Sequence, residues 1–412
     1  MKLYNSYSEK KETLDLSHPI GLYVCGITPY DTTHLGHAFT FLVYDVLVRY
    51  LRFLGNKVTY VQNVTDIDDD ILIKAKSLGT TWQALIQAET KKHFKNMAGL
   101  NALAPDIIPY ATGHIKEMIS IIKVLIARGL AYEKNGSVYF KIRSDKNFGK
   151  LSKLGYRAML QIANDRGNFP LDPNKRDPLD FVLWQKHKDG EPSWDSPWGR
   201  GRPGWHVECS AMAMKYLGPT ITIHGGGEDL IFPHHEAEIA QSENYTKQKF
   251  VKIWMHTGMV YCDQKKMSKS LGNMVFVCDL LKIYSANTLR LYLLSHHWRQ
   301  SWNYNEKKLE ESQKTAKILE KSATKSSMDD REVQKNLPVF FTALDDDLNI
   351  PQAIEVLVSF AKSKNLPAGR QGQAGELITK CGQILILILL FLNLLTIQIH
   401  SRYIKQESTG SL

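Results

Sequence analysis

The chain has 412 residues, of which 43% are hydrophobic and 23% are charged. This mixture excludes a disordered or fibrous protein and provides enough apolar residues for the core of two or three domains. Lys and Arg outnumber Asp and Glu by 52 − 42 = 10, which favours a polyanionic partner such as nucleic acid, although an incidentally basic enzyme has the same balance. Five widely spaced cysteines argue against a disulfide scaffold and for a reducing, cytoplasmic location. The first residues contain no apolar run typical of a signal peptide.

The first hundred residues have the pattern of an α/β unit. Gly21–Cys25 predicts a short strand, and a loop rich in Gly, Thr and Pro follows it. A helix is expected from about Gly36 to Leu54, with Gly55 placed to end it. Val58–Val61 predicts the next strand. A strand, a helix and a strand at this spacing imply a parallel βαβ unit, whose ligand crevice lies at the carboxyl ends of the strands.

The rest of the chain divides by pattern into three parts. Residues 105–200 contain an expected helix at Ile115–Arg128, an expected strand at Ser137–Ile142 and a polar, Pro-rich region. Residues 201–304 return to strand and loop patterns, and residues 305–412 are helical by pattern. We therefore predict an α/β fold: a Rossmann-like nucleotide-binding catalytic domain in two halves, 1–104 and 201–304, with a connective α/β insertion at 105–200 and a C-terminal helical bundle at 305–412.

Two features of the expected bundle allow alternative interpretations. Its Lys-rich start is a solvated helix face or a nucleic-acid contact, and contains Lys307, Lys308, Lys314 and Lys317. The segment Ile384–Leu395 is apolar except for Asn393, but it is shorter than the ~20 residues that a bilayer-spanning helix needs. We therefore expect a buried bundle helix there and no membrane anchor.

Two short motifs carry groups suited to phosphate chemistry. His34-Leu35-Gly36-His37 places two histidines at an expected helix start, where backbone N–H groups attract anions, and Gly36 allows a flat ligand to approach the backbone. Lys266-Met267-Ser268-Lys269-Ser270 offers two lysines that can neutralise a triphosphate and a departing pyrophosphate. Each motif alone is more typical of an ordinary loop. Together, in this order on a βαβ scaffold, they resemble the two signature sequences of class I aminoacyl-tRNA synthetases.

A third set of residues has the chemistry of metal ligands. A helix beginning near Pro233 would place His234 and Glu238 on one face. With Cys25 and Cys209 they offer two thiolates, one imidazole and one carboxylate, a plausible set for Zn²⁺. Spacing cannot select these four, because the cysteines are far apart in the sequence. By composition the equally available residues are His235, Glu236 and Cys262.

Five segments together resemble the cysteinyl-tRNA synthetases: GLYVCGITPYDTTHLGH, NVTDIDDDI, GRPGWHVECSAM, HGGGEDLIFPHHEAEIAQSE and KMSKSLGN. The likeness runs from about residue 15 to residue 300. It implies a zinc site made by Cys25, Cys209, His234 and Glu238, and catalytic roles for His34, His37, Lys266 and Lys269. It also implies that ATP contacts Gly36, Gly226, Asp229, His34, His37 and Lys269, and that the cysteine pocket contains Thr65, Trp205, His224 and Asp229.

The resemblance implies a cytoplasmic cysteine–tRNA ligase, which we expect to be a monomer, with L-cysteine, ATP with Mg²⁺ and tRNA(Cys) as its substrates and one Zn²⁺ per chain. Family members usually continue into a small C-terminal domain that helps to read the anticodon; we expect residues 305–412 to be a truncated tRNA-binding region and anticodon variants to be discriminated less sharply. Ile27-Thr28-Pro29-Tyr30-Asp31 also resembles the cysteine ligase of mycothiol synthesis, which passes cysteine to the amine of a glucosaminyl-inositol. Glu238, the charge of +10 and the Lys-rich bundle favour the synthetase.

Overall fold

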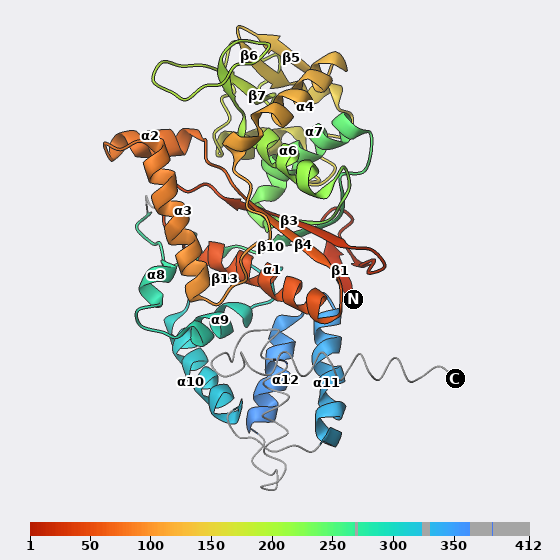
Figure 1. Cartoon of the computed structure of the whole chain (residues 1–412), viewed down its shortest axis with the longest axis vertical. Helices are drawn as coiled ribbons and strands as arrows, with labels where there is room; N and C mark the ends of the chain where they lie inside the picture. The colour runs from red at the N-terminus through yellow and green to blue at the C-terminus, as the bar shows by residue number, and fades with distance from the viewer. Residues whose placement is uncertain (268–270, 324–329, 363–380, 382–412) are drawn as a thin grey trace.

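A parallel four-stranded sheet occupies the middle of the molecule (Figure 1). The structure is a computed structural model that describes residues 1–267, 271–323, 330–362 and 381. The strands are β3 (Ile20–Ile27), β4 (Val58–Val64), β9 (Ile221–Gly227) and β10 (Val251–Thr257), in the order β10-β9-β3-β4. Each neighbouring pair is parallel. The predicted βαβ unit is therefore confirmed, and it is extended by two strands from the second half of the chain.

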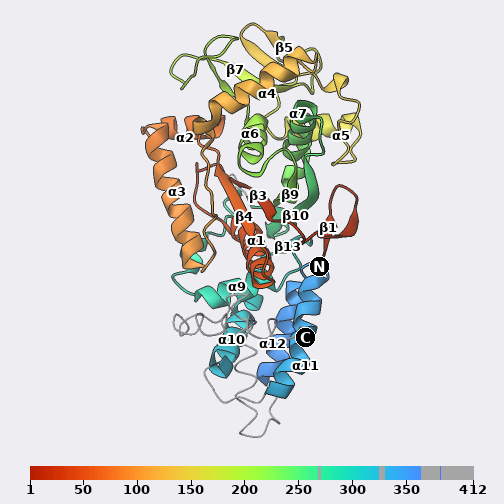
Figure 2. The ribbon, with the colours of Figure 1, turned by 45° about the vertical axis from the view of Figure 1, so that its right-hand side comes forward.

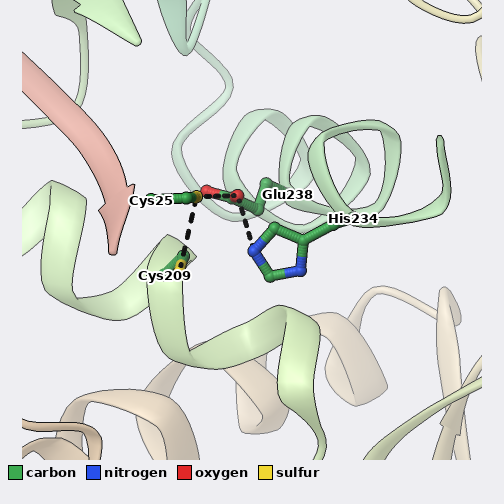
Figure 3. A group of neighbouring side chains, drawn as sticks. All are labelled: Cys25, Cys209, His234 and Glu238. Carbon is green, nitrogen blue, oxygen red and sulfur yellow. Dashed lines mark hydrogen bonds and ion pairs between the residues drawn. The ribbon is translucent and has the colours of Figure 1, made fainter. Parts of the chain in front are cut away.

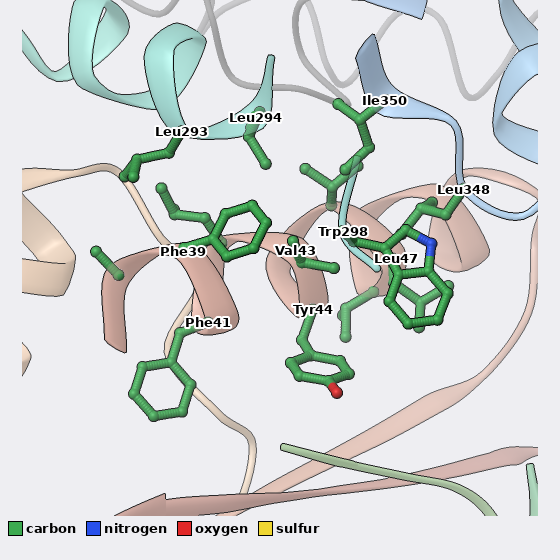
Figure 4. Packing of buried hydrophobic residues seen from close by; sticks show 14 of the residues in the cluster. Phe39, Phe41, Val43, Tyr44, Leu47, Leu293, Leu294, Trp298, Leu348 and Ile350 are labelled. Atoms are coloured by element: carbon green, nitrogen blue, oxygen red, sulfur yellow. The ribbon is translucent and has the colours of Figure 1, made fainter. Parts of the chain in front are cut away.

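The helix α1 (Leu35–Phe53) connects β3 to β4 and lies within one residue of its expected range. Gly55 follows it with φ +84°, a left-handed conformation that glycine adopts without strain. Almost every residue of α1 from Ala38 to Leu51 is buried, because one face lies on the sheet and the other packs on helices from the C-terminal part. Figure 4 shows this packing: the side chains of Phe39, Val43 and Leu47 lie beside those of α9 (Ala286–Leu294) and of the bundle.

A second, antiparallel sheet lies in the segment that separates β4 from β9. Its order is β5-β6-β7-β8, and it lies with α4 at one end of the molecule, whereas α3 extends away from it toward α8 (Val277–Leu280) (Figure 1). The expected helix at 115–128 and strand at 137–142 correspond to α4 and β6. The elements of this segment are α2 (Asp69–Ser77), α3 (Trp82–Gly99), α4 (Ile115–Ala127), β5 (Ala131–Lys134), β6 (Ser137–Phe140), α5 (Tyr156–Asn164), β7 (Phe181–Lys186), β8 (Gly201–Pro203) and α6 (Trp205–Leu217). A hairpin of β1 (Lys2–Asn5) and β2 (Lys10–Thr13) lies beside β10.

The connection from β9 to β10 contains the expected helix near Pro233, but with a later start. A π-helical turn at Ile231–His235 leads into α7, which begins at Glu236 and ends at Thr246. Phe232 has an extended backbone (φ −137°, ψ 135°), as expected for a residue that precedes proline. The regular helix therefore begins only after the turn.

The C-terminal part packs on α1 through a continuous apolar core (Figure 4). The core contains Leu293 and Trp298 near α9 and Leu348 and Leu357 near α12, all with exposed fractions of 1% or less. The elements are β11 (Val260–Cys262), β12 (Lys265–Lys266), α8 (Val277–Leu280), α9 (Ala286–Leu294), β13 (Trp302–Asn303), α10 (Glu306–Ala323), α11 (Asp330–Asp345) and α12 (Ile350–Lys362). The predicted helical bundle is thus present in α10, α11 and α12.

The apolar segment 384–395 lies outside the described residues. Within the described part of the chain, no helix is both long enough and apolar enough to span a bilayer.

Candidate functional site

A large cleft opens at the carboxyl ends of the central strands. The connection from β3 leads to β4 on one side of the sheet, and the connection from β9 leads to β10 on the other. The direction in which successive strands are added therefore reverses between β3 and β9. In open parallel sheets this switch point is where ligands bind. The cleft has a volume of about 1120 Å³ and lies between the sheet and the antiparallel insertion. Trp205, Asp229, His234 and Lys266, all expected site residues, line it.

The four predicted zinc ligands lie together (Figure 3), and one of them, His234, lines this cleft. Cys25 comes from β3, Cys209 from α6, His234 from the π-helical turn and Glu238 from the first turn of α7. Their donor atoms lie within 4.8 Å of one another, and none of the side chains is more than 6% exposed. The fold therefore brings together residues that spacing alone could not select.

The distances between these donors fit a tetrahedral Zn²⁺. Ligand distances of about 2.3 Å for sulfur and about 2.1 Å for nitrogen and oxygen give edges of about 3.8 Å (S–S), 3.6 Å (S–O) and 3.4 Å (N–O) in a tetrahedron. Cys25 Sγ lies 3.8 Å from Cys209 Sγ and 3.6 Å from Glu238 Oε1. His234 Nε2 lies 3.2 Å from the same oxygen of Glu238. The set Cys25, Cys209, His234 and Glu238 thus accommodates the ion with little adjustment.

Of the three alternative ligands, only His235 reaches the cluster. It belongs to a second possible set with Cys25, His224 and Glu238. Its Nε2 lies 3.2 Å from Cys25 Sγ but 3.9 Å from Glu238 Oε1, and His224 contacts the other carboxylate oxygen, Oε2, at 3.0 Å. These edges deviate further from a tetrahedron. The histidines His224 and His235 therefore suit a supporting role around the ligand set.

The other two alternatives point elsewhere. The carboxylate of Glu236 accepts hydrogen bonds from the backbone N–H groups of Leu151 (3.1 Å) and Ser152 (2.8 Å) in the insertion. Cys262 lies on β11 beside Asp263.

The electrostatics of the cluster also favour a bound cation. Burial raises the pKa of the Cys25 thiol well above its usual value, and Cys209 and Glu238 add to the effect. Burial lowers the pKa of His234 well below its usual value, so this imidazole is neutral at pH 7 and needs no deprotonation to act as a ligand. Two thiolates and a carboxylate would place three negative charges in a buried site. A divalent metal ion offsets most of that charge.

The HLGH motif begins α1 as expected. His34 is the N-cap, and its Nδ1 accepts the backbone N–H of Gly36 at 3.0 Å. Its ring stacks on that of His37, with 3.8 Å between centroids. A Cβ on Gly36 would lie 2.9 Å from His34 Cε1, so a larger residue would displace the His34 ring from this position.

Both histidines of the motif are neutral at pH 7. Loss of hydration lowers the pKa of His37 to about 4 and holds the pKa of His34 well below its usual value. Since His34 Nδ1 is an acceptor, its proton is on Nε2, which can donate to a ligand. Nδ1 of His37 is buried and has no hydrogen-bond partner among the described residues. The pair therefore offers neutral N–H donors rather than fixed positive charges.

Of the expected nucleotide residues beyond this motif, Asp229 and Lys266 line the cleft. Lys266 Nζ pairs with Asp229 Oδ2 at 3.0 Å. The N–H of Gly226 is already donated to the hydroxyl of Tyr44 at 2.8 Å, so Gly226 can contribute space but not this N–H to a nucleotide. Lys269 lies outside the described residues.

Three of the four residues expected to hold cysteine lie around the metal cluster, and the fourth, Asp229, is the partner of Lys266. Thr65 is buried after β4, where its Oγ1 accepts the Asn63 side-chain N–H at 3.2 Å. Trp205 begins α6, and its ring lies 4.3 Å from that of His234. His224 is fully buried and contacts Glu238 directly, so it orients a ligand of the cluster.

Three further residues support the site and were not predicted. Asn63 Oδ1 lies 3.7 Å from Cys209 Sγ and also accepts the N–H of Gly26. His206 Nδ1 lies 3.0 Å from His234 Nδ1, and His256 Nε2 lies 2.7 Å from His235 Nδ1. A polar residue at the carboxyl end of a central strand was the signal that could have identified Asn63. The partners of the histidines depend on the tertiary structure, and no local pattern indicates them.

Comparison with known proteins agrees with this geometry. Residues 13–314 match the family described as tRNA synthetases class I (C) catalytic domain. The cysteine–tRNA ligase of Cronobacter sakazakii is 46% identical over 375 residues, which cover 89% of this chain and 79% of that protein. The cysteine–tRNA ligase of Thermodesulfovibrio yellowstonii is 43% identical over 387 residues, with the same coverage.

Solved structures with low sequence identity share the fold. The methionyl-tRNA synthetase of Mycobacterium tuberculosis in complex with methionyl-adenylate aligns with a TM-score of 0.63 at 13% identity, covering 90% of each chain. The LeuRS–tRNA–LeuAMS ternary complex of Agrobacterium radiobacter aligns with a TM-score of 0.62 at 12% identity, covering 91% of this chain and 85% of that one. With a family match over residues 13–314 and close relatives along most of its length, this chain belongs to the class I tRNA synthetases, in the cysteine–tRNA ligase family.

Proposed function

We propose that this protein activates L-cysteine with ATP and transfers the cysteinyl group to tRNA(Cys). The observation that carries the proposal is the buried set of Cys25, Cys209, His234 and Glu238 at the switch point of the sheet, on the cleft that Lys266 also lines. A thiol-selective site next to phosphate-binding groups suits the adenylation of cysteine. The cysteine–tRNA ligase relatives, at 43–46% identity, support the same activity.

In the first step, a carboxylate oxygen of cysteine attacks the α-phosphorus of Mg-ATP, and the bond from that phosphorus to the pyrophosphate oxygen breaks. His34 and His37 would donate neutral N–H groups to the phosphates, which stabilises the charge that develops without a fixed cation. Lys266 would add positive charge from the cleft lining, and we propose the same role for Lys269 from its place in the motif. Because Lys266 is paired with Asp229, the lysine is held over the cleft before the substrate arrives.

Selection against serine is the main demand on the amino acid pocket. Serine is nearly isosteric with cysteine, and shape alone supplies only about 1–3 kcal/mol of discrimination. A bound Zn²⁺ supplies a soft Lewis acid that favours a thiolate over a neutral hydroxyl. The protein itself fixes the ligands: His224 orients Glu238, and Asn63 contacts Cys209. Thr65, Trp205 and Asp229 would line the pocket around the cysteine and its adenylate.

In the second step, a ribose hydroxyl of the terminal adenosine of the tRNA attacks the carbonyl carbon of the adenylate, and AMP leaves. We propose that residues 1–104 and 201–304 form the catalytic domain, that residues 105–200 form the insertion, and that residues 305–412 contribute to tRNA binding. We also propose that the protein is a cytoplasmic monomer; a molar mass near 47 kDa by light scattering would agree with this, whereas twice that value would not.

The acceptor is the point that an experiment must decide. The purified protein is given cysteine and ATP, with either a tRNA(Cys) transcript or a glucosaminyl-inositol as the acceptor. We expect cysteinylation of the tRNA and none of the sugar amine. Adenylate formation, measured by ATP–pyrophosphate exchange, is common to both candidate reactions and is the control for active protein. Transfer to the sugar amine alone would replace the proposal with the ligase of mycothiol synthesis.

A further inference from the structure

The loop between α5 and β7 holds two apolar side chains in solvent. Phe169 is 71% exposed and Leu171 is 86% exposed, the highest values among the large hydrophobic residues of the described chain. Of the two, Phe169 lines the cleft that contains the candidate site, and Leu171 does not. Exposed apolar residues are common when single, but a Phe presented toward a binding cleft calls for an explanation.

The loop is fixed by side-chain hydrogen bonds along its length. Asn168 donates to Asn164 Oδ1 at 2.7 Å and to the Pro178 carbonyl at 3.0 Å. Asp172 accepts the hydroxyl of Tyr139 at 2.7 Å, so the loop is also attached to β6. These hydrogen bonds hold the loop in place. They keep the Phe169 ring in the cleft wall and prevent it from turning into the protein core.

The same loop is connected to the nucleotide side of the site. The guanidinium of Arg166 donates hydrogen bonds to the carbonyl oxygens of Asp229 and Phe232. The carboxylate of Asp229 is the partner of Lys266. Figure 2 shows α5, which precedes the loop, on the side of the molecule where α7 lies, and α5 packs against the turn that carries His234. The loop that carries Phe169 is therefore attached to the side of the cleft where the adenylate would form.

The size of the cleft leaves room for a ligand larger than an adenylate. Its volume of about 1120 Å³ exceeds the range of roughly 300–1,000 Å³ typical of small-molecule sites. Its lining carries six basic and six acidic side chains, and the basic ones on the insertion side include Lys175, Lys186 and Lys188. An exposed aromatic ring beside basic groups is the combination that binds single-stranded nucleic acid: the ring stacks on a base, and the cations contact the phosphates.

We propose that Phe169 is a stacking platform for a base in the unpaired 3′ end of the tRNA. This inference rests on the proposed function, because the terminal ribose must reach the adenylate through this cleft. Stacking on the cleft wall would fix the strand next to the reaction site. Every base has a π-face, so the contact positions the end of the strand without reading its sequence.

The test compares four variants: Phe169→Ala, Phe169→Leu, Phe169→Tyr and Leu171→Ala. Stacking contributes about 1–3 kcal/mol per base, so we expect Phe169→Ala to lower kcat/KM for tRNA charging by about 5- to 150-fold. Phe169→Leu should lose nearly as much, because it keeps an apolar surface but no π-face, whereas Phe169→Tyr should retain charging. Leu171→Ala is the matched control and should charge like the wild type. Since Phe169 is exposed, cysteine-dependent pyrophosphate exchange and thermal unfolding should be unchanged in all four.

A binding measurement separates this inference from the proposed function. A tRNA(Cys) transcript with 2-aminopurine at an unpaired 3′ position is titrated with each variant, without ATP or cysteine. Stacking quenches 2-aminopurine, so we expect quenching with the wild type and Phe169→Tyr, and its loss with Phe169→Ala. If the wild type charges tRNA but Phe169→Ala or Phe169→Leu charges equally well, the stacking role is overturned while the ligase activity stands. Equal quenching by the wild type and Phe169→Ala overturns it whether or not the protein charges tRNA.

Discussion

At the residue scale, Cys209 gives the sharpest test of the metal site. Its thiol is 2% exposed and lies 3.8 Å from Cys25, so serine in its place removes one of two sulfur ligands. We expect Cys209→Ser to lose bound zinc and to lower cysteine-dependent pyrophosphate exchange by about 100-fold or more. Metal analysis of the purified variant and an exchange assay measure the two effects. Cys262→Ser, on β11 and outside the cluster, is the matched control and should keep both properties. One zinc per chain in Cys209→Ser would contradict the proposed ligand set.

A buried histidine next to the HLGH motif makes stability depend on pH. Burial lowers the pKa of His93 to about 3, against about 6.5 in the unfolded chain, and the side chain is 3% exposed. Between pH 3 and pH 6.5, His93 therefore binds a proton in the unfolded state but not in the folded state. Stability is fully present above pH 6.5 and falls as the pH drops toward 3, by up to about 1.4 kcal/mol per pH unit for this group.

The variant His93→Gln should flatten this acid dependence. Urea unfolding at pH 7 and at pH 5 gives the loss of stability between the two pH values. We expect this loss to be about 2 kcal/mol larger in the wild type than in the variant. His18→Gln removes an exposed histidine and should leave the dependence as it is in the wild type. The same acid dependence in His93→Gln and the wild type would mean that His93 is protonated in the folded protein.

The chemistry of the site residues could be read from the sequence, but their arrangement could not. Local patterns and resemblance identified the HLGH motif and the four candidate ligands, because residue type carries the chemistry. By composition, His234 and His235 were equally good candidates for the histidine ligand. The structure separates them through a 3.2 Å contact of His234 with the Glu238 oxygen that also faces Cys25, a geometry set by the π-helical turn. Such a turn has no sequence pattern that we could have used.

At the element scale, a buried ion pair joins α1 to α9. Arg290 Nη2 lies 2.6 Å from Asp45 Oδ2, and the two side chains are 0% and 2% exposed. Asp45 also accepts a hydrogen bond from Arg49, and Arg290 donates to the carbonyl of Leu100. The pair thus connects the helix that begins with HLGH to the helix that precedes the bundle.

Removing one partner of this pair should be costly. Among the described residues, Arg290→Ala leaves the buried Asp45 with Arg49 as its remaining cation, and we expect a loss of about 3–5 kcal/mol. Arg52→Ala breaks a similar pair with Asp106 that is more than a third exposed on both sides, and it should cost about 1 kcal/mol or less. Urea unfolding followed by tryptophan fluorescence measures both. Equal losses in the two variants would show that burial does not determine the effect.

Elements with a strong local periodicity were predicted well, and pairings between distant segments were not. The limits of α1 and α4 follow from apolar spacing and from the glycines that end them, so both were within one residue. The pairing of β3 with β9 joins residues about 200 positions apart, and long connections separate β7 of the insertion sheet from its partners β6 and β8. No local pattern reports such contacts, because they depend on the fold as a whole.

At the scale of the whole molecule, the three parts form an elongated body. The insertion lies at one end, the bundle at the other, and the central sheet with its cleft lies between them (Figures 1 and 2). The lysines at the start of α10, predicted as either a solvated face or a nucleic-acid contact, are exposed: Lys307, Lys308, Lys314 and Lys317. They lie on the bundle and not in the cleft, so they can contribute to tRNA binding only through contacts remote from the reaction site.

This arrangement predicts that tRNA affinity and adenylate formation respond differently to the bundle lysines. If the four side chains contact phosphates, the affinity for tRNA(Cys) falls steeply with added salt, because each contact releases counterions. Replacing all four by Ala should reduce the slope of log affinity against log salt by about one per lost contact and leave pyrophosphate exchange unchanged. Replacement of the same four by Arg keeps the charge and should keep the slope, which separates charge from any loss of helix packing. Filter binding between 50 and 300 mM salt gives the slopes. An unchanged slope in the Ala variant would assign these lysines to a solvated face, and tRNA binding would then depend on cations in other parts of the protein.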